Sequence, residues 1–234
     1  MTAPLEYALE LGDGSSHSAV LDIIGQFGRL EVLDLGCSGG ELAHALRSAG
    51  HRVTGVDVVE VAGVRERVDR FVRSDLALGL PLDELARDYD LIIAADVIEH
   101  LPRPAQTLQE ARSLLRPGGQ LLLSVPNFAH WYPRIRVLLG AFGYDRRGIL
   151  DDTHLRFFTR RTLRRTVRRA GFDILEERST GLPLGVVGES SDAKRKGAHA
   201  LDELLVRLRP QLFAYQYVLR LTPHVESQLR VEVF

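Results

Sequence analysis

Three titratable side chains follow an apolar run in AADVIEHL, residues 94–101. Asp96, Glu99 and His100 stand at positions i, i+3 and i+4, so a helical turn would gather them on one side of the chain. An imidazole near carboxylates can accept a proton close to neutral pH, and the same groups can hold a divalent cation. The structural alternative is a carboxylate that caps a turn and an imidazole packed at a sheet edge. The choice depends on what the remaining chain places around this segment.

A second group of similar chemistry lies in GILDDTHLRFFTRRTL, residues 148–163. Asp151, Asp152 and His154 come directly before a stretch of aromatic and basic residues. The apolar segment 120–127 should end at the same sheet edge as AADVIEHL, so we expect the chain to fold back over that edge. His154 and His100 are therefore the candidates for a catalytic base or an orienting group.

A glycine turn separates an apolar run from a helical pattern in VLDLGCSGGE, residues 32–41. Gly36, Gly39 and Gly40 allow the backbone to approach a ligand closely, and the helix N-terminus behind them favours negative charge. The dinucleotide fingerprint G-x-G-x-x-G and the phosphate loop G-x-x-x-x-G-K-[ST] are both absent. The turn therefore argues against a nicotinamide site and against a nucleoside triphosphate site of the phosphate-loop type.

Acidic residues end the next two predicted strands. Asp57 follows Gly36 by 21 positions, a spacing at which a carboxylate can accept hydrogen bonds from a ribose diol. Asp75, in RSDL, lies where the third predicted strand ends, beside the position that an adenine ring would fill. Each acid could instead cap a helix or lie in a solvated loop, and for Asp75 alone that interpretation is preferred. The order of the three features along successive strand ends favours a nucleoside site.

The hydrophobic periodicity predicts alternating strands and helices up to residue 127. Strands are expected at 30–36, 51–59, 71–76, 89–96 and 120–127, and helices at 15–27 (capped by Ser15 or Ser16), 41–50, 61–70 and 105–119. A helix at 160–170, a strand at 172–178, a mobile loop at 181–192 that continues through KRK, a helix near 198–209 and a strand at 213–223 complete the pattern. Such alternation predicts an α/β fold with a parallel sheet between two layers of helices.

The composition restricts the class of protein. The chain has 234 residues, is 45% hydrophobic and 26% charged, and carries a net charge of −1, which predicts a globular domain without a nucleic-acid or membrane partner. Cys37 is the sole cysteine, so no intrachain disulfide can form and a reducing compartment is expected. The first residues lack a signal-peptide pattern, and no apolar run could span a bilayer, so we expect a cytoplasmic protein.

Residues 15–127 resemble the class I S-adenosylmethionine-dependent methyltransferases. VLDLGCSGG resembles their glycine motif, GVDVV their ribose-binding acid, RSDL their adenine-side acid, and LRPGGQLLLSVPN their late helix–strand signature. The resemblance implies a Rossmann-like, doubly wound, seven-stranded sheet that is mostly parallel with an antiparallel last strand, has helices on both faces and carries a helical, aromatic lid insertion. Ser38 replaces the central glycine of G-x-G-x-G, which affects the local backbone path, and Gly39 can compensate.

The resemblance also assigns S-adenosylmethionine as cofactor and S-adenosylhomocysteine as product. The glycines would face the methionine part, Asp57 would hold the ribose, and Asp75 would contact the adenine amine. Cys37 would fill the turn rather than act as a nucleophile. The expected cofactor contacts are Asp34, Gly36, Cys37, Gly39, Gly40, Asp57, Val58, Asp75, Leu76 and Asp96.

Two branches of this superfamily carry a related pattern at the end of the fourth strand. Ubiquinone-pathway O-methyltransferases have Glu-x-x-Glu-His there, and small-RNA 3′-terminal ribose methyltransferases add a later histidine. Glu99, His100 and His154 match three of these positions, whereas Asp96 replaces the first glutamate and is one methylene shorter. A divalent metal held by these four residues is the less favoured interpretation. Direct acid–base or positioning chemistry by His154 and His100 is preferred, with no resident metal.

Residues 127–152 should cover the acceptor. The aromatic residues could form apolar walls and the arginines could pair with an anionic acceptor, although a packed helical cap is nearly as well supported. RRTLRRTVRR, residues 160–169, predicts a solvated helix face, with an RNA-binding strip as the weaker alternative. The expected acceptor contacts are Glu99, His130, Trp131, Tyr132 and Asp152.

Together these features predict methyl transfer from S-adenosylmethionine to a small-molecule acceptor, with a hydroxyl oxygen preferred. The alternatives are RNA ribose 2′-O-methylation, N-methylation of a small amine and, least favoured, a non-enzymatic nucleoside-binding protein. One domain is expected, with a cofactor-binding core at 15–127, a lid at 128–158 and a completion of the sheet at 159–234. The sequence gives no indication of the oligomeric state.

Overall fold

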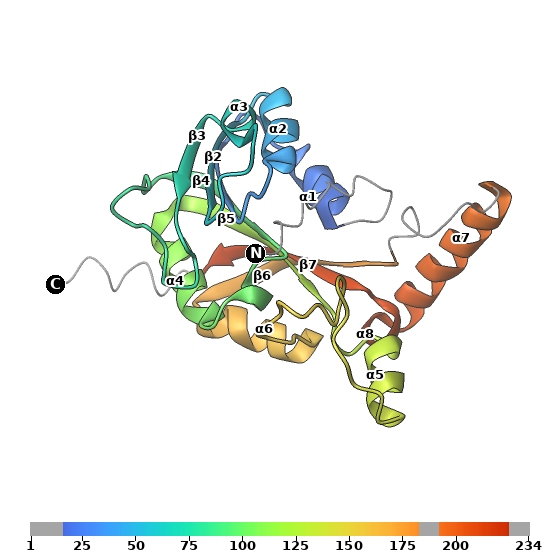
Figure 1. The fold of residues 1–234 in the computed structure, drawn as a ribbon. Helices are drawn as coiled ribbons and strands as arrows, with labels where there is room; N and C mark the ends of the chain where they lie inside the picture. The colour runs from blue at the N-terminus through green and yellow to red at the C-terminus, as the bar shows by residue number, and fades with distance from the viewer. Residues whose placement is uncertain (1–15, 183–191, 225–234) are drawn as a thin grey trace.

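A single seven-stranded sheet forms the centre of the protein in a computed structural model that describes residues 16–182 and 192–224. The strand order is β3-β2-β1-β4-β5-β7-β6 (Figure 1). The strands are β1 Glu31–Leu35, β2 Arg52–Asp57, β3 Arg70–Arg73, β4 Tyr89–Ala95, β5 Leu115–Pro126, β6 Phe172–Thr180 and β7 Gln216–Pro223. β7 runs antiparallel to both of its neighbours, β5 and β6, whereas the other pairs are parallel. The expected fold class is confirmed.

Helices cover both faces of the sheet. They are α1 Ser16–Ile24, α2 Glu41–Ser48, α3 Val64–Arg67, the 3-10 turn η1 Ile98–His100, α4 Pro104–Leu114, α5 Trp131–Leu138, α6 Arg160–Arg169, α7 Asp192–Leu208 and α8 Pro210–Phe213. One apolar core joins the sheet to α1, α2 and α3, and a second joins it to α4 and α6. Adjacent β4 residues Ile92 and Ile93 point into different cores, as expected for a strand buried on both sides. No helix in the described ranges is long and apolar enough to cross a bilayer.

Three predicted element boundaries are wrong. The KRK segment lies inside α7, not in a mobile loop, because residues around it are good helix formers. The helix predicted at 105–119 ends at Leu114, since Leu115 already pairs with Tyr89 of β4. Gly119 permits this pairing, because a Cβ there would lie 2.8 Å from the Tyr89 carbonyl oxygen. A short helix, α8, occupies the start of the last predicted strand. Ser15 and most of the predicted 181–192 loop lie outside the described residues.

The excursion between β5 and α6 returns to the edge of the sheet where the parallel strands end. Asn127 and Phe158 form an isolated parallel bridge, and the Phe128 amide donates to the Phe158 carbonyl at 2.8 Å. Within this excursion α5 projects away from the body of the protein (Figure 1). The bridge between the two ends of the excursion therefore holds residues 149–158 over the carboxyl ends of the strands. Helix α5, in the earlier part of the excursion, extends outward.

The central position of β4 makes one stability prediction. Ile93 is fully buried and lies between Asp34 of β1 and Leu122 of β5 in the strand register. We expect Ile93→Ala to lower the free energy of unfolding by about 2–5 kcal/mol, because it removes apolar contacts and leaves a cavity. Urea denaturation measures this, and Leu78→Ala is the control, since the Leu78 side chain is 78% exposed. An Ile93→Ala midpoint equal to that of the wild type would contradict the packing described.

Candidate active site

The glycine turn after β1 has the backbone form that close approach to a ligand requires. Gly36 and Gly40 have φ values of 69° and 79°, and a Cβ on Gly36 would lie 2.7 Å from Cγ2 of Val97. Ser38 also adopts a positive φ, 47°, although it is not glycine. Its amide donates to Oδ2 of Asp57 at 2.9 Å, which holds the turn against the end of β2. The departure from the glycine pattern is therefore accommodated by a left-handed serine.

Cys37 has the packing of a structural residue. Its Sγ lies 2.7 Å from where a Cβ on Gly55 would stand, so the thiol fills the space above that glycine. Burial raises the pKa of the Cys37 thiol, and the charges of Asp34 and Asp57 raise it further. A thiol that resists ionisation is a poor nucleophile, which agrees with the expected filler role.

The acids expected to face a nucleoside differ in their surroundings. Asp57 is half-buried and accepts a second backbone hydrogen bond, from the Val59 amide at 3.0 Å. Val58 beside it is 49% exposed, which leaves apolar surface at the end of β2. Asp75 is exposed and accepts from the Ala77 amide at 2.9 Å, while Leu76 is buried. Asp75 therefore caps its own turn here, and its contact with an adenine stays a prediction.

Asp34 is a buried carboxyl at the end of β1. Burial, together with a smaller contribution from the charge of Asp57, raises its pKa to about 7. Its Oδ2 atom has no hydrogen-bond partner among the described residues. A buried acceptor without a donor is costly, so this position favours a ligand that brings a donor or a positive charge.

Asp96 anchors several elements rather than facing open space. Its φ of 55° turns the chain sharply out of β4. Its carboxylate accepts hydrogen bonds from the hydroxyls of Ser16 and Ser124, at 3.1 and 2.9 Å, and from Nε2 of Gln216 at 2.9 and 3.0 Å. These contacts tie together α1, β5 and β7. They also occupy the carboxylate that the metal hypothesis named as its first ligand.

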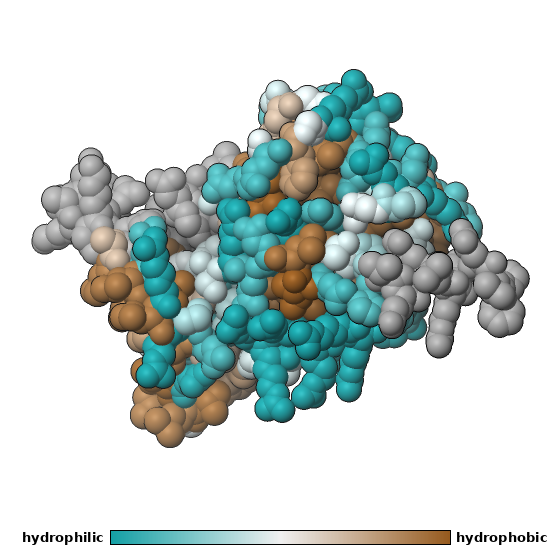
Figure 2. Space-filling model, turned by 180° about the vertical axis from the view of Figure 1, so that it is seen from behind, coloured by the Kyte–Doolittle hydropathy of each residue, from teal (hydrophilic) through white to brown (hydrophobic). Residues whose placement is uncertain are grey.

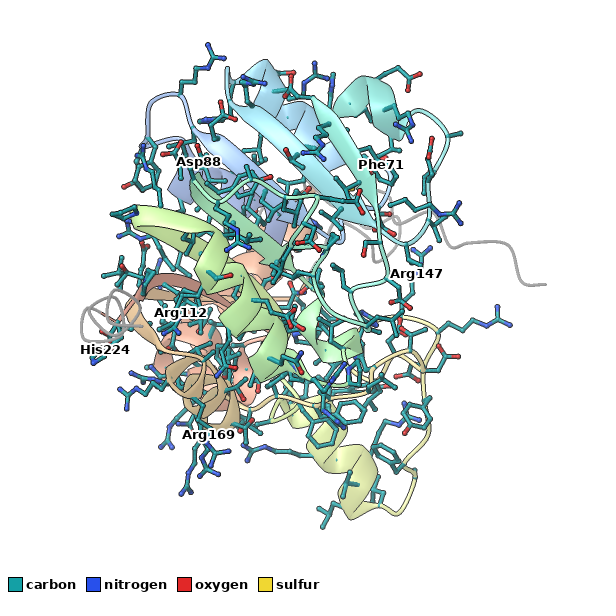
Figure 3. The ribbon with its side chains drawn as sticks, turned by 90° about the vertical axis from the view of Figure 1, so that its left-hand side faces the viewer. Phe71, Asp88, Arg112, Arg147, Arg169 and His224 are labelled. Carbon is teal, nitrogen blue, oxygen red and sulfur yellow. The ribbon has the colours of Figure 1, made fainter. Side chains whose placement is uncertain are left out.

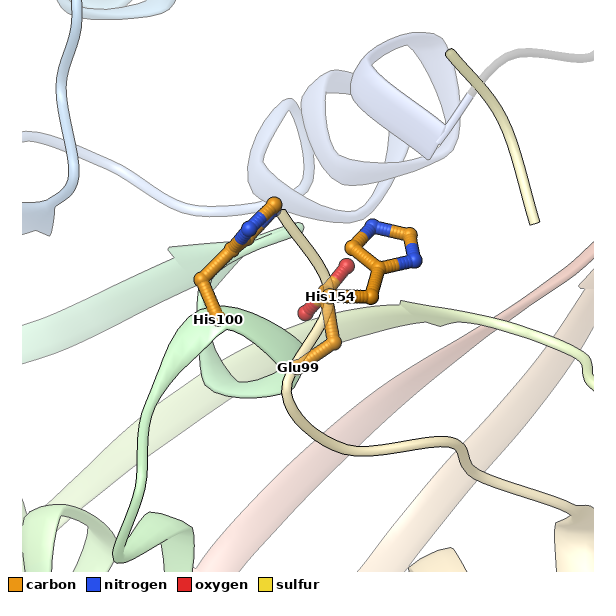
Figure 4. Close-up of side chains that lie close together, drawn as sticks. All are labelled: Glu99, His100 and His154. Atoms are coloured by element: carbon orange, nitrogen blue, oxygen red, sulfur yellow. The ribbon is translucent and has the colours of Figure 1, made fainter. Parts of the chain in front are cut away.

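Glu99, His100 and His154 converge at the same edge (Figure 4). Each offers one ligand atom, and these atoms lie within 4.8 Å of one another. The two imidazole centroids are 4.7 Å apart. The amides of Leu155 and Arg156 donate to the Glu99 carbonyl at 2.9 and 2.8 Å, which fixes the His154 segment against η1. The structure thus brings together three of the four residues in that hypothesis.

The hydrogen bonds at Nδ1 define which nitrogen of each imidazole is free. Nδ1 of His154 lies 3.2 Å from the Ile149 carbonyl, which can only accept, so Nδ1 carries the proton. Nδ1 of His100 lies 3.3 Å from the Thr153 carbonyl and 3.1 Å from the Thr153 hydroxyl. That hydroxyl donates to Oδ1 of buried Asp151 at 2.5 Å and therefore accepts from His100. Both rings keep a lone pair on Nε2, which can take up a proton or bind a cation.

Burial controls the charges in this cluster. Glu99 is buried, and neither of its carboxyl oxygens has a hydrogen-bond partner among the described residues. Burial raises the pKa of Glu99 well above its ordinary value, and the charges of Asp96 and Asp151 raise it further. Burial and the neighbouring His100 lower the pKa of His154. The cluster therefore holds a neutral imidazole and a carboxyl without donors, which suits proton acceptance from a ligand hydroxyl.

The lid residues expected to bind the acceptor are engaged within the lid. His130 is buried, and its Nδ1 accepts from the Tyr132 amide at 3.3 Å as the N-cap of α5. The Tyr132 hydroxyl donates to Asp145 at 2.8 Å and accepts from Arg136 at 2.7 Å. Trp131 is 39% exposed and Asp152 is exposed. Their contacts with an acceptor stay predictions.

Asp151 and Thr153 are further functional candidates, because they orient His100, and they are not among the site residues predicted from the sequence. Oδ1 of Asp151 accepts from the Thr153 amide at 2.9 Å as well as from the Thr153 hydroxyl. The Asp-x-Thr spacing is typical of such local side-chain to backbone turns and was the available signal. The contact between Thr153 and His100 joins residues far apart in the sequence, so the spacing of residues could not predict it.

Comparison with known proteins places the chain among methyltransferases. A family profile described as a methyltransferase domain matches residues 10–177. The ubiquinone biosynthesis O-methyltransferase of Aromatoleum aromaticum is 32% identical over 156 residues, which cover 62% of this chain and 64% of that protein. The protein of the same name from Leptothrix cholodnii is 33% identical over 114 residues, 44% of this chain and 47% of its own length. The matched regions thus span about half to just under two thirds of these relatives.

Solved structures share the fold. A SAM-dependent methyltransferase from Archaeoglobus fulgidus has a TM-score of 0.61 at 21% identity and covers 91% of this chain and 96% of its own. A 1,6-didemethyltoxoflavin-N1-methyltransferase from Burkholderia thailandensis, solved with S-adenosylhomocysteine, has a TM-score of 0.59 at 22% identity. It covers 91% of this chain and 80% of its own. At these identities the likeness concerns the fold.

The buried N-cap residue of α5, His130, should make the folding stability depend on pH. Burial lowers the pKa of His130 from 6.5 to about 4. Between these values the unfolded chain binds a proton that the folded protein does not, so stability present above pH 6.5 falls as the pH is lowered. We expect His130→Asn, which keeps an acceptor for the Tyr132 amide, to reduce this loss by up to about 1.4 kcal/mol per pH unit. Urea denaturation across this pH range measures it, with exposed His44→Asn as control. Equal slopes for wild type and His130→Asn would contradict the lowered pKa.

Proposed function

The chain belongs to the methyltransferase-domain family, and from this membership we propose that it transfers a methyl group from S-adenosylmethionine to a hydroxyl oxygen of a small-molecule acceptor. The observation that carries the proposal is the meeting of the glycine turn and Asp57 with Glu99, His100 and His154 at one sheet edge. The printed name of the O-methyltransferase relatives supports oxygen as the acceptor atom. The two imidazoles held by hydrogen bonds at Nδ1 also support oxygen as the acceptor atom, because an alcohol or phenol must lose a proton during the reaction.

The cofactor would lie across the carboxyl ends of β1 and β2. Gly36, Gly39 and Gly40 would face its methionine part, and the two oxygens of Asp57 would accept from the ribose hydroxyls. The unpartnered Oδ2 of Asp34 supports a donor or cationic group nearby, such as the ammonium of that methionine part. Exposed Val58 and buried Leu76 would border the adenine, with Asp75 at its amine.

The residues of this chain would provide acceptor orientation and proton removal. When bound, the cofactor supplies an already activated methyl group, so the acceptor oxygen must be held in line with it. The oxygen's lone pair would form the new carbon–oxygen bond as the carbon–sulfur bond breaks and its electron pair returns to sulfur. The acceptor proton passes to Nε2 of His154 or His100. Because Nδ1 of each ring donates its proton in a hydrogen bond, Nε2 of each ring keeps its lone pair.

A divalent cation is a second candidate at the same position, favoured by the convergence of three ligand atoms within 4.8 Å. Within the part of the chain that the structure describes, the carboxyl oxygens of Glu99 lack donors and the Nε2 atoms of His100 and His154 have no hydrogen-bond partner, so these residues fit such an ion. When bound, a cation would lower the pKa of the acceptor hydroxyl. We prefer direct histidine chemistry, because Asp96, which would be the fourth ligand, is engaged by Ser16, Ser124 and Gln216.

Cofactor binding tests the assignment of Asp57. Asp57→Asn removes the charge from an acceptor of two hydrogen bonds, so we expect S-adenosylmethionine to bind roughly 10- to 100-fold more weakly. Isothermal titration calorimetry on the folded variant measures this. Exposed Asp83→Asn is the matched control and should bind as the wild type does. Wild-type affinity in Asp57→Asn would refute the ribose assignment, and a wild type without affinity for the cofactor would refute the function.

Methyl transfer to a panel of phenols, catechols and sugar diols separates the two candidate chemistries. Direct histidine chemistry predicts that dialysis against a chelator leaves turnover unchanged. His154→Ala or His100→Ala should then lower kcat by about 100-fold or more at unchanged cofactor affinity, with exposed His44→Ala as control. Wild-type turnover should rise with pH through a value below 6.5, because the pKa of His154 is lowered.

The metal candidate predicts instead that chelation abolishes turnover and that Mg²⁺ or Mn²⁺ restores it. Turnover that survives both chelation and the double substitution of His100 and His154 would exclude both chemistries. The cluster would then have a structural role at the end of β4.

A further inference from the structure

Helix α6 presents two adjacent rows of arginines on its outer side. Leu163 and Val167 on the opposite side are buried against the sheet. With Gln211 of α8 the arginines border a hollow of about 700 Å³. Among the described residues, Glu177 pairs with Arg160 and, at 3.7 Å, with Arg164, while the others have no ion-pair partner. Figure 3 shows Arg169 pointing away from the body. The arginines, in two rows with i, i+4 spacing, are Arg160, Arg161, Arg164, Arg165, Arg168 and Arg169.

The end of helix α5 is apolar and exposed. Val137, Leu138 and Leu139 are 53%, 84% and 74% exposed, and Ile135 one turn earlier is 47% exposed. At 3.6 residues per turn, three consecutive residues span about 200° of the helix circumference. The helix end is therefore surrounded by solvent on most sides, and its apolar side chains are not one face awaiting a flat partner.

The two features lie on the same side of the protein. Burial raises the pKa of Tyr217 to about 12 against the opposing charges of Arg160 on α6 and Arg134 on α5, so both helices bring a guanidinium group toward this ring. Figure 1 shows α6, α8 and α5 along one side. Seen from behind, Figure 2 shows a protruding apolar region over α5 beside hydrophilic side chains. We call the α6 arginines together with the exposed apolar residues of α5 the α5–α6 surface.

We propose that the α5–α6 surface docks the protein onto a bilayer that contains anionic phospholipids. An apolar helix end exposed on most sides can be buried completely by insertion among lipid headgroups and upper acyl chains. Arginines beside it can pair bidentately with headgroup phosphates, and each contributes to attraction by an anionic leaflet. The net charge of −1 led us to expect no membrane partner, but it averages over the chain and conceals this local concentration of charge.

A nucleic-acid strand and a protein partner fit the surface less well. Helix α6 carries no aromatic side chain among its arginines on which bases could stack. A second copy of this chain would bring two arginine rows together and repel. A flat protein partner would cover one side of the α5 end and leave the remaining apolar side chains exposed.

Vesicle flotation with the full chain tests the docking. We expect binding to phosphatidylcholine vesicles that contain phosphatidylglycerol, and binding at least about tenfold weaker to phosphatidylcholine alone. Raising the salt concentration from about 0.05 M to about 0.5 M should release the protein, because exposed charges are then screened. Arg165→Gln with Arg169→Gln should weaken binding about tenfold or more, and so should Leu138→Ser with Leu139→Ser.

One double variant, Arg29→Gln with Arg87→Gln, and one single variant, Leu78→Ser, serve as controls, since they change exposed residues elsewhere. All variants should melt like the wild type by circular dichroism. Equal binding to neutral and anionic vesicles, no binding to either, or unchanged binding by both surface variants would overturn the proposal. Salt-dependent binding of a single-stranded RNA oligonucleotide without vesicle binding would assign the arginines to nucleic acid and also overturn it. S-adenosylmethionine affinity should be unchanged in the variants, so a failure here is distinguishable from a failure of the proposed function.

Discussion

The carboxylate of Asp96 is the contact on which the site edge depends. It joins the start of α1, the carboxyl end of β5 and the start of β7 through Ser16, Ser124 and Gln216, and its left-handed backbone turns the chain from β4 into η1. Each of its hydrogen bonds involves an ionised acceptor and is therefore among the stronger ones. With Asp96 fully hydrogen-bonded, Glu99 is the carboxyl of this strand end that finds no donor among the described residues.

Two buried carboxyls without full hydrogen bonding thus stand at the ends of the neighbouring strands β1 and β4. Asp34 lies under the glycine turn and Glu99 lies under the two imidazoles. Burial raises the pKa of both, so the folded protein resists the charge that these groups would carry in water. Their cost is borne by the two apolar cores on either side of the sheet. Such groups are expected where a ligand completes the bonding, and in the proposed function Asp34 would face the cofactor and Glu99 the acceptor.

The sequence predicted the elements with strong periodicity and missed what depends on distant partners. The buried β4 and the order of Gly36, Asp57 and Asp75 along the strand ends follow from local pattern, and the sheet agrees with them. The role of Asp96 could not be predicted, because Ser16 and Gln216 lie 80 and 120 positions away. The same holds for the His100 tautomer, which Thr153 determines from 53 positions away. The KRK segment, predicted to continue the Gly- and Ser-containing loop before it, lies inside α7, because its residues and their neighbours are good helix formers.

The excursion between β5 and α6 connects the candidate site with the outer surface. Its ends are closed by the Asn127–Phe158 bridge, and its later part is held to η1 by the two amides that donate to Glu99. Its earlier part, α5, is linked to the later part through Asp145, which binds Tyr132 and Arg136 by its side chain and pairs with Asp151 by its backbone. Asp151 in turn orients His100 through Thr153. A chain of named contacts therefore runs from the exposed helix to the His100 imidazole, so that movement of α5 would be transmitted to the Nε2 atom that is proposed to take up the acceptor proton.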